Sequence, residues 1–413
     1  MISIQVQRKK GVSFEKIGIG LFSLYILTSY IANGVLLPSQ LNSYALYLFL
    51  GFSILKMFFH KTLVIKPITV WQLVFMGISL ISMMYSPEKS ILSGAFYALI
   101  INFVLVLLLS QYNLTENTVQ AILWTFSTSG LILVLLMAVT GNLTDIYGRL
   151  GTELVGNANA LASMLMISSI CGLWLFVYGT NRKIKKILLL LCVVADYVGL
   201  FLSGGRKYIV IPMIFLYLLF LFKQDKKGRN HIVKYTVIII IAAVVMLYLI
   251  MNVPAFYNSL GVRLESFLSF MNGDLGNADY SAIVRSEMIK GGIQKWLESP
   301  IWGYGFNSFK YYNQTLTGNF YYSHNNFVEL LYNTGLLGFI AYYCLYARIL
   351  VASVRKKGAC KLQHKAFIVA FTISLLVYEY TQVDYTDTMI VIMLLLAHSM
   401  VELHREVMKC NEE

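Results

Sequence analysis

Charged residues are scarce in this chain of 413 residues, since Asp, Glu, Lys and Arg make up only 13% of it. A soluble domain carries about 25%. Apolar residues make up 58% and form long uninterrupted runs. The shortage of charge therefore excludes an ordinary soluble fold, and the runs indicate a polytopic membrane protein. Six prolines and 29 glycines do not suggest disorder.

Several functional signatures are absent as well. The chain has no Gly-rich phosphate loop, no metal-ligand spacing and no internal repeat. None of its five cysteines lies in the long polar segment from about residue 253 to 324, so no disulfide framework is indicated. Because no nucleotide site is indicated, any work done outside the cell must be driven by an activated substrate or by a gradient.

The apolar runs predict about twelve membrane spans, because a span needs about 20 mostly apolar residues. The basic first 16 residues resemble the start of a signal peptide, but the apolar run that follows is long and lacks a cleavage site, so we interpret it as a retained first span. The predicted spans are residues 17–37, 43–59, 68–85, 90–109, 121–140, 158–179, 186–203, 204–222, 232–252, 336–354, 364–382 and 388–403.

The distribution of Lys and Arg sets the predicted orientation. With the N terminus inside, the inner segments hold 24 of the 33 basic residues, which follows the positive-inside rule. The net charge of +13 is therefore a sign of topology rather than of nucleic-acid binding. Both termini are predicted to be cytoplasmic and the segment from about 253 to 324 extracytoplasmic. The nine basic residues left on the outer side are Lys89, Arg149, Arg206, Lys207, Arg263, Arg285, Lys290, Lys295 and Lys310.

The predicted architecture is an all-α polytopic membrane protein in three parts. Residues 1–252 form the first nine spans, residues 253–335 form a large extracytoplasmic loop with short helices, and residues 336–413 form the last three spans and a cytoplasmic tail. The junction of the last two parts predicts a short helix over residues 325–332. Asn333 and Gly335 can end it, since both residue types tolerate positive φ, and an apolar helix starts again at Leu336.

Four outer side chains are candidates for chemistry, each with a structural alternative. Arg206, with Lys207, lies in the first turn of a predicted span, where cations and the helix dipole suit an anion; both could instead reach lipid headgroups. Arg285 lies on an amphipathic helix, where a solvated arginine is common. Arg149 precedes a span that Asn157 can cap. His324 stands at the mouth of a span, and its ordinary pKa near 6.5 suits proton transfer; a lone histidine at a membrane interface can instead be structural.

Four stretches, in this order, resemble the O-antigen polymerase and ligase family of bacterial membrane glycosyltransferases. They are Asn157-Ala158-Asn159-Ala160-Leu161-Ala162 after Arg149, then Ser203-Gly204-Gly205-Arg206, then Arg285 with Trp296 and Ser299-Pro300-Ile301-Trp302-Gly303-Tyr304-Gly305-Phe306, and finally Ser323-His324-Asn325 with Gly335-Leu336-Leu337-Gly338. The likeness covers about residues 147 to 345. Lys207 and Tyr208 depart from it, since small residues are commoner there.

The resemblance implies an extracytoplasmic active site of the GT-C type in the bacterial cytoplasmic membrane. Its donor is a glycan on undecaprenyl pyrophosphate, and no metal or other cofactor is used. Arg206 and Arg285 then grip the pyrophosphate with help from Arg149 and Lys207, and His324 takes the proton of an acceptor hydroxyl. Asn325 lies beside the base, Glu329 or Glu287 orients it, and Tyr304 and Tyr322 are among the tyrosines that can stack on sugars; the same aromatics also suit a membrane interface.

The resemblance leaves the acceptor open. A polymerase extends another lipid-linked repeat unit, whereas a ligase transfers the glycan to a different acceptor. The abundance of Ile, Lys, Asn and Tyr suggests an AT-rich Gram-positive genome, which favours a polymerase of capsule or O-antigen-like repeat units. A flippase and a chain-length regulator are the implied protein partners. The alternative class is a transporter of lipid-linked glycan, which predicts paired repeats and midplane acids; Asp196 is the one clear intramembrane acid in the sequence.

Overall fold

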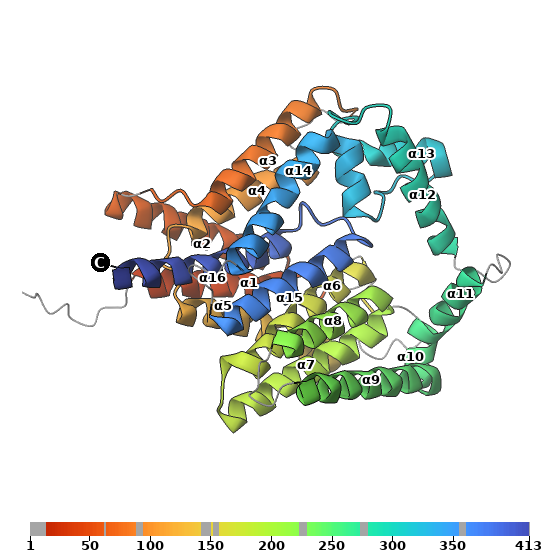
Figure 1. Ribbon diagram of the computed structural model, residues 1–413, viewed down its shortest axis with the longest axis horizontal. Helices are drawn as coiled ribbons and strands as arrows, with labels where there is room; N and C mark the ends of the chain where they lie inside the picture. Colours follow the sequence, from red (N-terminus) through yellow and green to blue (C-terminus); the bar gives the residue numbers. More distant parts are fainter. Residues whose placement is uncertain are drawn as a thin grey trace, which may run out of the picture.

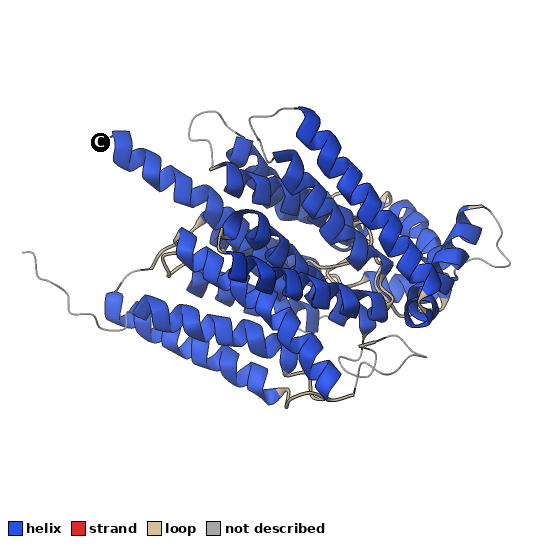
Figure 2. Ribbon diagram, turned by 90° about the horizontal axis from the view of Figure 1, so that it is seen from below, coloured by secondary structure: helices blue, strands red, loops and turns tan. Residues whose placement is uncertain are grey.

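The computed structural model describes residues 14–61, 63–87, 94–141, 150–151, 157–222, 229–272, 280–354 and 361–412. Every regular element within these ranges is a helix, as predicted. Figure 2 shows that most of the long helices run in similar directions, with loops at their ends. In chain order the elements are α1 (Phe14–Ile31), α2 (Gln40–His60), α3 (Pro67–Met83), α4 (Gly94–Leu109), α5 (Glu116–Val139), α6 (Ala158–Trp174), η1 (Leu175–Gly179), α7 (Lys183–Ser203), α8 (Arg206–Phe222), α9 (Arg229–Asn252), α10 (Pro254–Phe256), η2 (Tyr257–Gly261), α11 (Val262–Met271), α12 (Tyr280–Trp296), α13 (Phe309–Thr317), α14 (Asn326–Val354), α15 (Leu362–Glu379) and α16 (Thr388–Glu412).

Six of the described helices are long and apolar enough to cross a membrane: α1, α2, α5, α6 with η1, α7 and α14. A seventh candidate is bent by 91° between Thr236–Asn252 and Pro254–Ser269. The predicted membrane protein is thus confirmed, but the count of twelve spans is not. Three predicted spans fall on the shorter apolar helices α3, α4 and Thr388–Leu403. The predicted span over residues 204–222 is the 17-residue helix α8, whose length of about 25 Å is less than a hydrocarbon core of about 30 Å.

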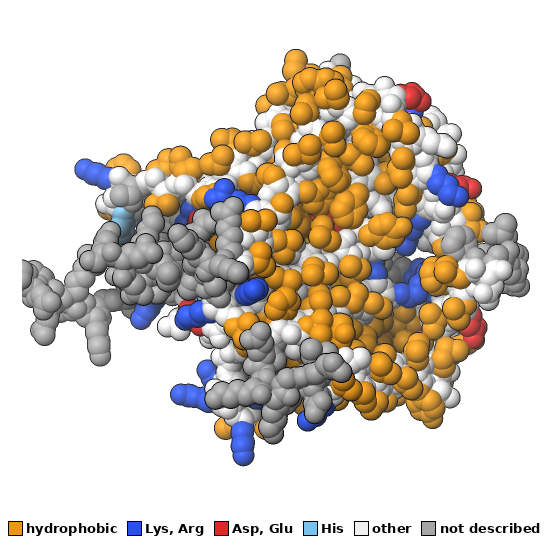
Figure 3. All heavy atoms as spheres, viewed as in Figure 1, with side chains coloured by type: hydrophobic (Ala, Val, Ile, Leu, Met, Phe, Trp, Pro, Cys, Tyr) orange, Lys and Arg blue, Asp and Glu red, His pale blue; other side chains and the backbone are white. Residues whose placement is uncertain are grey.

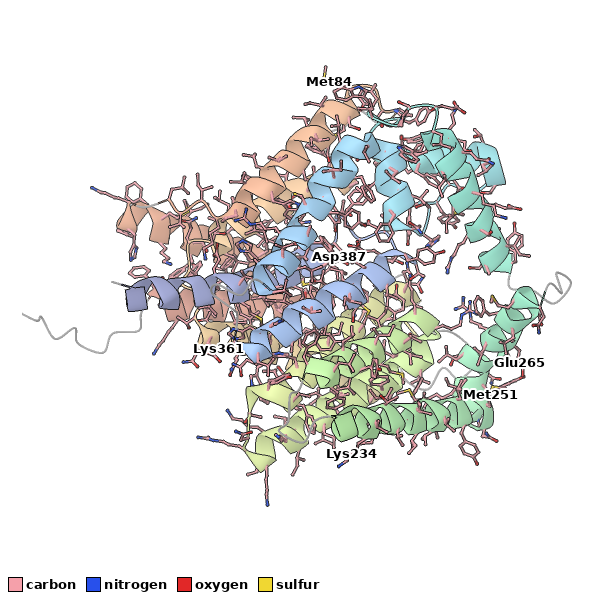
Figure 4. The ribbon with its side chains drawn as sticks, in the orientation of Figure 1. Met84, Lys234, Met251, Glu265, Lys361 and Asp387 are labelled. Carbon is pink, nitrogen blue, oxygen red and sulfur yellow. The ribbon has the colours of Figure 1, made fainter. Side chains whose placement is uncertain are left out.

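The elements α10 to α13 gather at one end of the molecule, opposite the C terminus (Figure 1). In Figure 4, Met251 and Glu265 lie at this end, whereas Lys361 lies toward the other. Helix α9 runs between the two ends, from Lys234 to Met251. Lys361, which the charge pattern assigns to the inner side, and Glu265, in the predicted outer segment, therefore lie toward opposite ends. Which end faces the cytoplasm remains a prediction from the positive-inside rule.

Helix α6 forms the centre of the bundle. Within the span that α6 makes with η1, 78% of the most apolar 18 residues are buried, and α6 packs against α5, α7 and α8. Its small side chains, such as Ala162 and Ser168, allow this close packing. Helix α15 packs against α8, and α14 packs against α3 and α15. Because α15 packs against both α8 and α14, it connects these two helices.

Helix α14 is interrupted at Gly335, whose φ of 62° and ψ of −166° are not helical. The predicted break is confirmed, and a neighbouring loop satisfies the backbone groups that it frees. Tyr304 N donates to Tyr332 O over 2.7 Å, Gly305 N to Asn333 O over 2.9 Å, and Leu336 N to Pro300 O over 2.8 Å. The two glycine-containing stretches of the sequence thus pair with each other across the break.

We predict that Gly335→Ala destabilises the protein much more than Gly318→Ala. Gly318, with a φ of 77°, lies in the left-handed region, which costs an Ala about 1–2 kcal/mol. Gly335, with a φ of 62° and a ψ of −166°, lies in a region that essentially only glycine adopts. At Gly335 an added Cβ would also overlap the carbonyl oxygen of Ile301, whereas at Gly318 it would meet nothing within 4 Å. Thermal unfolding of the purified variants checks this, and equal losses would contradict the role given to the break.

Candidate functional site

A cavity of about 400 Å³ lies where the N terminus of α8 meets α11, α12 and α15. Four cationic side chains line it: Arg206, Lys207, Arg263 and Arg285. Figure 3 shows Lys and Arg side chains gathered at a recess on the right of the molecule. Because the N-terminal end of a helix carries partial positive charge, α8 adds to the attraction for an anion. We call this space the anion cavity.

Arg206 and Arg263 fix each other in place. Arg206 Nη1 donates to the carbonyl oxygen of Arg263 over 2.5 Å, and Arg263 Nη1 donates to the carbonyl oxygen of Gly204 over 3.1 Å. The Arg206 guanidinium also lies 5.0 Å from the ring centre of Phe267. Two guanidinium groups at one cavity resist each other's approach unless such contacts hold them. Arg263 was noticed in the sequence only as an outer cation, and no local pattern linked it to Arg206.

Lys207 lines the anion cavity but also holds the loop after α15. Its Nζ donates to Thr381 O over 2.6 Å and to Gln382 Oε1 over 2.7 Å. Gln382 in turn donates from Nε2 to Tyr322 OH over 3.4 Å. Asn159, from the start of α6, lines the same cavity. The sequence showed Asn159 within an Asn-rich span start, but its distance of more than 100 residues from Arg285 hid the fact that both line one cavity.

A second, smaller cavity of about 190 Å³ contains His324. Tyr280, Asn319 and Tyr321 contribute to its wall, as does Arg285. Arg285 therefore lines both cavities. The buried neighbours Val284 and Met288 on α12 pack in a small core with residues of α13 and α14, which places Arg285 at this junction. We call this space the histidine cavity.

The backbone at His324 has a φ of 56°, which is uncommon for a residue with a side chain. Its imidazole packs on Tyr322, with 4.4 Å between ring centres. The buried Nδ1 atom makes no hydrogen bond with any described residue. Burial, followed by the positive charges of Arg285 and Lys207, lowers the pKa of His324 to about 3. The imidazole is therefore neutral near pH 7 and has a nitrogen available to accept a proton.

A chain of hydrogen bonds connects the helix break to His324. Asn333 Oδ1 accepts from the backbone N of Ser308 and of Phe309 at the start of α13, and Asn333 Nδ2 donates to Glu329 Oε1 over 3.2 Å. Glu329 Oε2 accepts from the backbone N of Ser323 over 2.7 Å. Glu329 is thus bonded to the residue before His324, and no described bond joins it to the imidazole.

The remaining predicted site residues lie at different places. Asn325 is buried, caps α14 through its Oδ1 and donates to Tyr380 O over 3.0 Å. Tyr322 lies against His324. Tyr304 stacks on Tyr332 and donates to Glu298, outside both cavities. Arg149 lies outside the described residues. The substrate-binding roles of these four residues remain predictions.

Comparison with known families bears on these cavities, since a family model described as O-antigen ligase matches residues 188–343. Residues 188–343 are thus similar to an O-antigen ligase domain. The resemblance seen in the sequence is thereby confirmed. No curated protein matches the chain. The matched region contains the four cations of the anion cavity and His324, whereas Asn159 comes from a helix before it.

Two buried acids follow the matched region in the chain, in addition to the Asp196 seen in the sequence. Glu379 is fully buried at the end of α15 and accepts hydrogen bonds from Tyr342 and Tyr346. Asp384 is 2% exposed, and its backbone N donates to Asn326 Oδ1 over 3.2 Å. In the sequence only Asp196 was evident as an intramembrane acid. Glu379 lies at the end of its apolar run, and Asp384 lies beyond that run.

We predict that His324 makes the stability of the protein depend on pH. The folded pKa of about 3 lies below the value of about 6.5 for an unfolded chain, so the unfolded state binds the proton first. The resulting stabilisation is full above about pH 6.5 and is lost as the pH falls toward about 3. His324→Asn keeps a residue that tolerates positive φ and should lose less stability on acidification. Thermal unfolding at pH values from about 7.5 to about 4.5 measures this, and parallel curves for the two proteins would contradict it.

Proposed function

We propose that the protein is a polysaccharide polymerase that joins glycan repeat units carried on undecaprenyl pyrophosphate at the outer face of the cytoplasmic membrane. The observation that carries the proposal is the position of Arg285, which lines both the anion cavity and the histidine cavity. A donor pyrophosphate held on one side of Arg285 has its anomeric carbon directed toward a hydroxyl held on the other. The match to O-antigen ligase supports the reaction class.

In this mechanism the anion cavity holds the leaving group. Arginine remains charged at any relevant pH and can bond to two phosphate oxygens at once. Arg206, Arg263 and Arg285 offset the negative charge that grows on the pyrophosphate as the anomeric C–O bond breaks, so these cationic side chains can act without a metal. Lys207 holds the loop that carries Gln382 and so keeps Tyr322 against His324. Arg149 is proposed to assist at the same leaving group.

The histidine cavity receives the acceptor sugar. Its hydroxyl oxygen attacks the anomeric carbon, the electron pair of the broken bond leaves with the lipid pyrophosphate, and His324 takes the hydroxyl proton. A single displacement inverts the anomeric configuration. A free imidazole with a pKa of about 3 is a weak base. Bound pyrophosphate offsets the charges of Arg285 and Lys207, which raises the proton affinity of His324 once the donor is in place.

The family description favours a second candidate, a ligase that transfers the glycan to an acceptor other than a lipid-linked repeat. The two differ in product. Purified protein supplied only with lipid-linked repeat units forms a ladder of longer chains if it is a polymerase. A ligase gives a product only when a second acceptor is added. The buried acids Glu379 and Asp384 keep a transporter in consideration, and it would move labelled glycan across liposomes without lengthening it.

We predict that His324→Asn and Arg285→Ala each lower the rate of glycan transfer about 100-fold or more, because they remove the general base and a charge at the leaving group. Lys290→Ala is the matched control, since Lys290 is an exposed cation on the same helix and lines neither cavity. It should retain the rate of the unaltered protein. Normal rates in well-folded His324→Asn and Arg285→Ala would refute the assignment.

We also predict that inorganic pyrophosphate raises the pKa of His324 from its low value of about 3. NMR titration of the imidazole in the purified protein, with and without pyrophosphate, measures the shift. Arg285→Ala removes one of the two nearby charges that lower the pKa and should raise it without pyrophosphate. An unchanged titration on adding pyrophosphate, under conditions in which it binds, would show that the anion cavity and His324 are not coupled.

A further inference from the structure

Two exposed tyrosines stand on opposite walls of the histidine cavity. One wall is the start of α12, where Tyr280 is 72% exposed and Val284 and Met288 are buried. The other wall is the segment before α14, where Tyr321 is 60% exposed and precedes His324 by three residues. Two accessible aromatic rings and a buried apolar surface thus line the same cavity as the imidazole.

The size and lining of this cavity suit one sugar ring. A pyranose has hydroxyls around its edge and C–H groups on its face, so that its face can cover an aromatic ring. The space of about 190 Å³ is below the range of about 300–1,000 Å³ that encloses a drug-sized molecule, so it admits a single sugar residue and not an oligosaccharide. A purely apolar ligand fits less well, because Ser281, Asn319 and Arg285 also line the cavity.

The segment that carries Tyr321 is held by the side chain of Asn313 on α13. Asn313 is fully buried, and its Nδ2 donates to Asn319 O over 3.0 Å and to Tyr321 O over 3.2 Å. Asn319 Nδ2 donates to Thr317 O over 3.2 Å, and no bond with a described residue involves its Oδ1. This turn is therefore fixed before a ligand arrives, which lowers the entropy cost of binding.

Packing does not account for the two exposed rings. Within the part of the chain that the structure describes, no hydrogen bond or ring contact engages the side chain of Tyr280 or Tyr321. The tyrosines predicted from the sequence to bind sugars differ in this respect. Tyr304 stacks on Tyr332, and Tyr322 packs on the imidazole without lining the cavity.

We propose that Tyr280 and Tyr321 form a subsite for the terminal sugar of the acceptor, a single pyranose whose C–H face covers these rings while one hydroxyl lies toward His324. The inference rests on the proposed function, because the subsite receives the acceptor that is assigned there to the histidine cavity. Only the terminal residue is enclosed. The affinity for the acceptor therefore depends on this sugar and little on the length of the chain behind it.

A soluble acceptor tests the subsite. Mild acid releases the repeat-unit oligosaccharide from its lipid, and the released sugar has no pyrophosphate to lose, so it can act only as an acceptor. With lipid-linked repeat units as donor and the full chain in nanodiscs, Tyr280→Ala and Tyr321→Ala should each raise the KM for the oligosaccharide about tenfold and leave kcat unchanged, because a lost ring contact weakens the ground state and the transition state alike. Tyr280→Phe and Tyr321→Phe keep the ring face and should keep the KM.

Tyr311→Ala is the matched control. Tyr311 packs on Phe320, with 5.0 Å between ring centres, and lines neither cavity. Its loss should leave the KM unchanged. Binding of inorganic pyrophosphate should be retained in every variant, which shows that each has folded. Tyr280→Leu and Tyr321→Leu remove the rings but keep apolar bulk, and they should repeat the result of the Ala variants.

The outcomes separate this inference from the proposed function. An unchanged KM in the Ala and Leu variants, a loss confined to kcat, or an equal effect of Tyr311→Ala would overturn the subsite and leave the function standing. Polymerisation of lipid-linked units by a protein that does not use the free oligosaccharide as an acceptor would do the same. If the unaltered protein lengthens neither lipid-linked units nor the oligosaccharide, the proposed function fails, and the subsite fails with it.

Discussion

The positions of His324 and of Ser323 before it depend on the break in α14. A continuous helix would pair the carbonyls of Tyr332 and Asn333 internally, but Gly335 leaves the helical conformation and these carbonyls accept from Tyr304 and Gly305 instead. The side chain of Asn333, held at the break, then bonds to Glu329, and Glu329 bonds to the backbone of Ser323. A backbone irregularity in an apolar helix thus determines where an imidazole stands, because buried backbone groups must find partners.

Arg285 lines both the anion cavity, where the positive charges gather, and the histidine cavity, which contains the neutral imidazole of His324. Backbone carbonyls hold Arg206 and Arg263 at the anion cavity, and the loop after α15 holds Lys207 there. Arg285 lines the same cavity from α12. These cations repel a proton on His324, and burial does the same. The arrangement favours an unprotonated imidazole, and under the proposed function the bound pyrophosphate links ligand charge to base strength through the field inside the cavity.

Periodicity and residue type predicted the parts of the fold that depend on short stretches of chain. The start of α8 at Arg206 and the break near Gly335 follow from local preferences, and both are present. The buried face of α12 could not be predicted in this way. Ile293 continues its apolar pattern but is 40% exposed, whereas Val284, Met288, Gly291 and Gly292 are buried. Glycines contribute no hydrophobic signal, and in a membrane protein an exposed Ile is stable against lipid.

The sequence by itself determined that the protein is helical and lies in a membrane, that basic residues remain at a predicted outer face, and that a histidine stands at a helix start. These properties follow from composition, run length and the preferences of neighbouring residues. Only the tertiary structure decided that Arg263 meets Arg206, that Asn159 lines the anion cavity, that Lys207 holds the loop after α15 and that Glu329 anchors Ser323. Most of these contacts join segments far apart in the chain, and helix packing decides which segments meet. Glu329 reaches Ser323 because the chain turns at His324. A single sequence shows neither the helix packing nor the course of this turn.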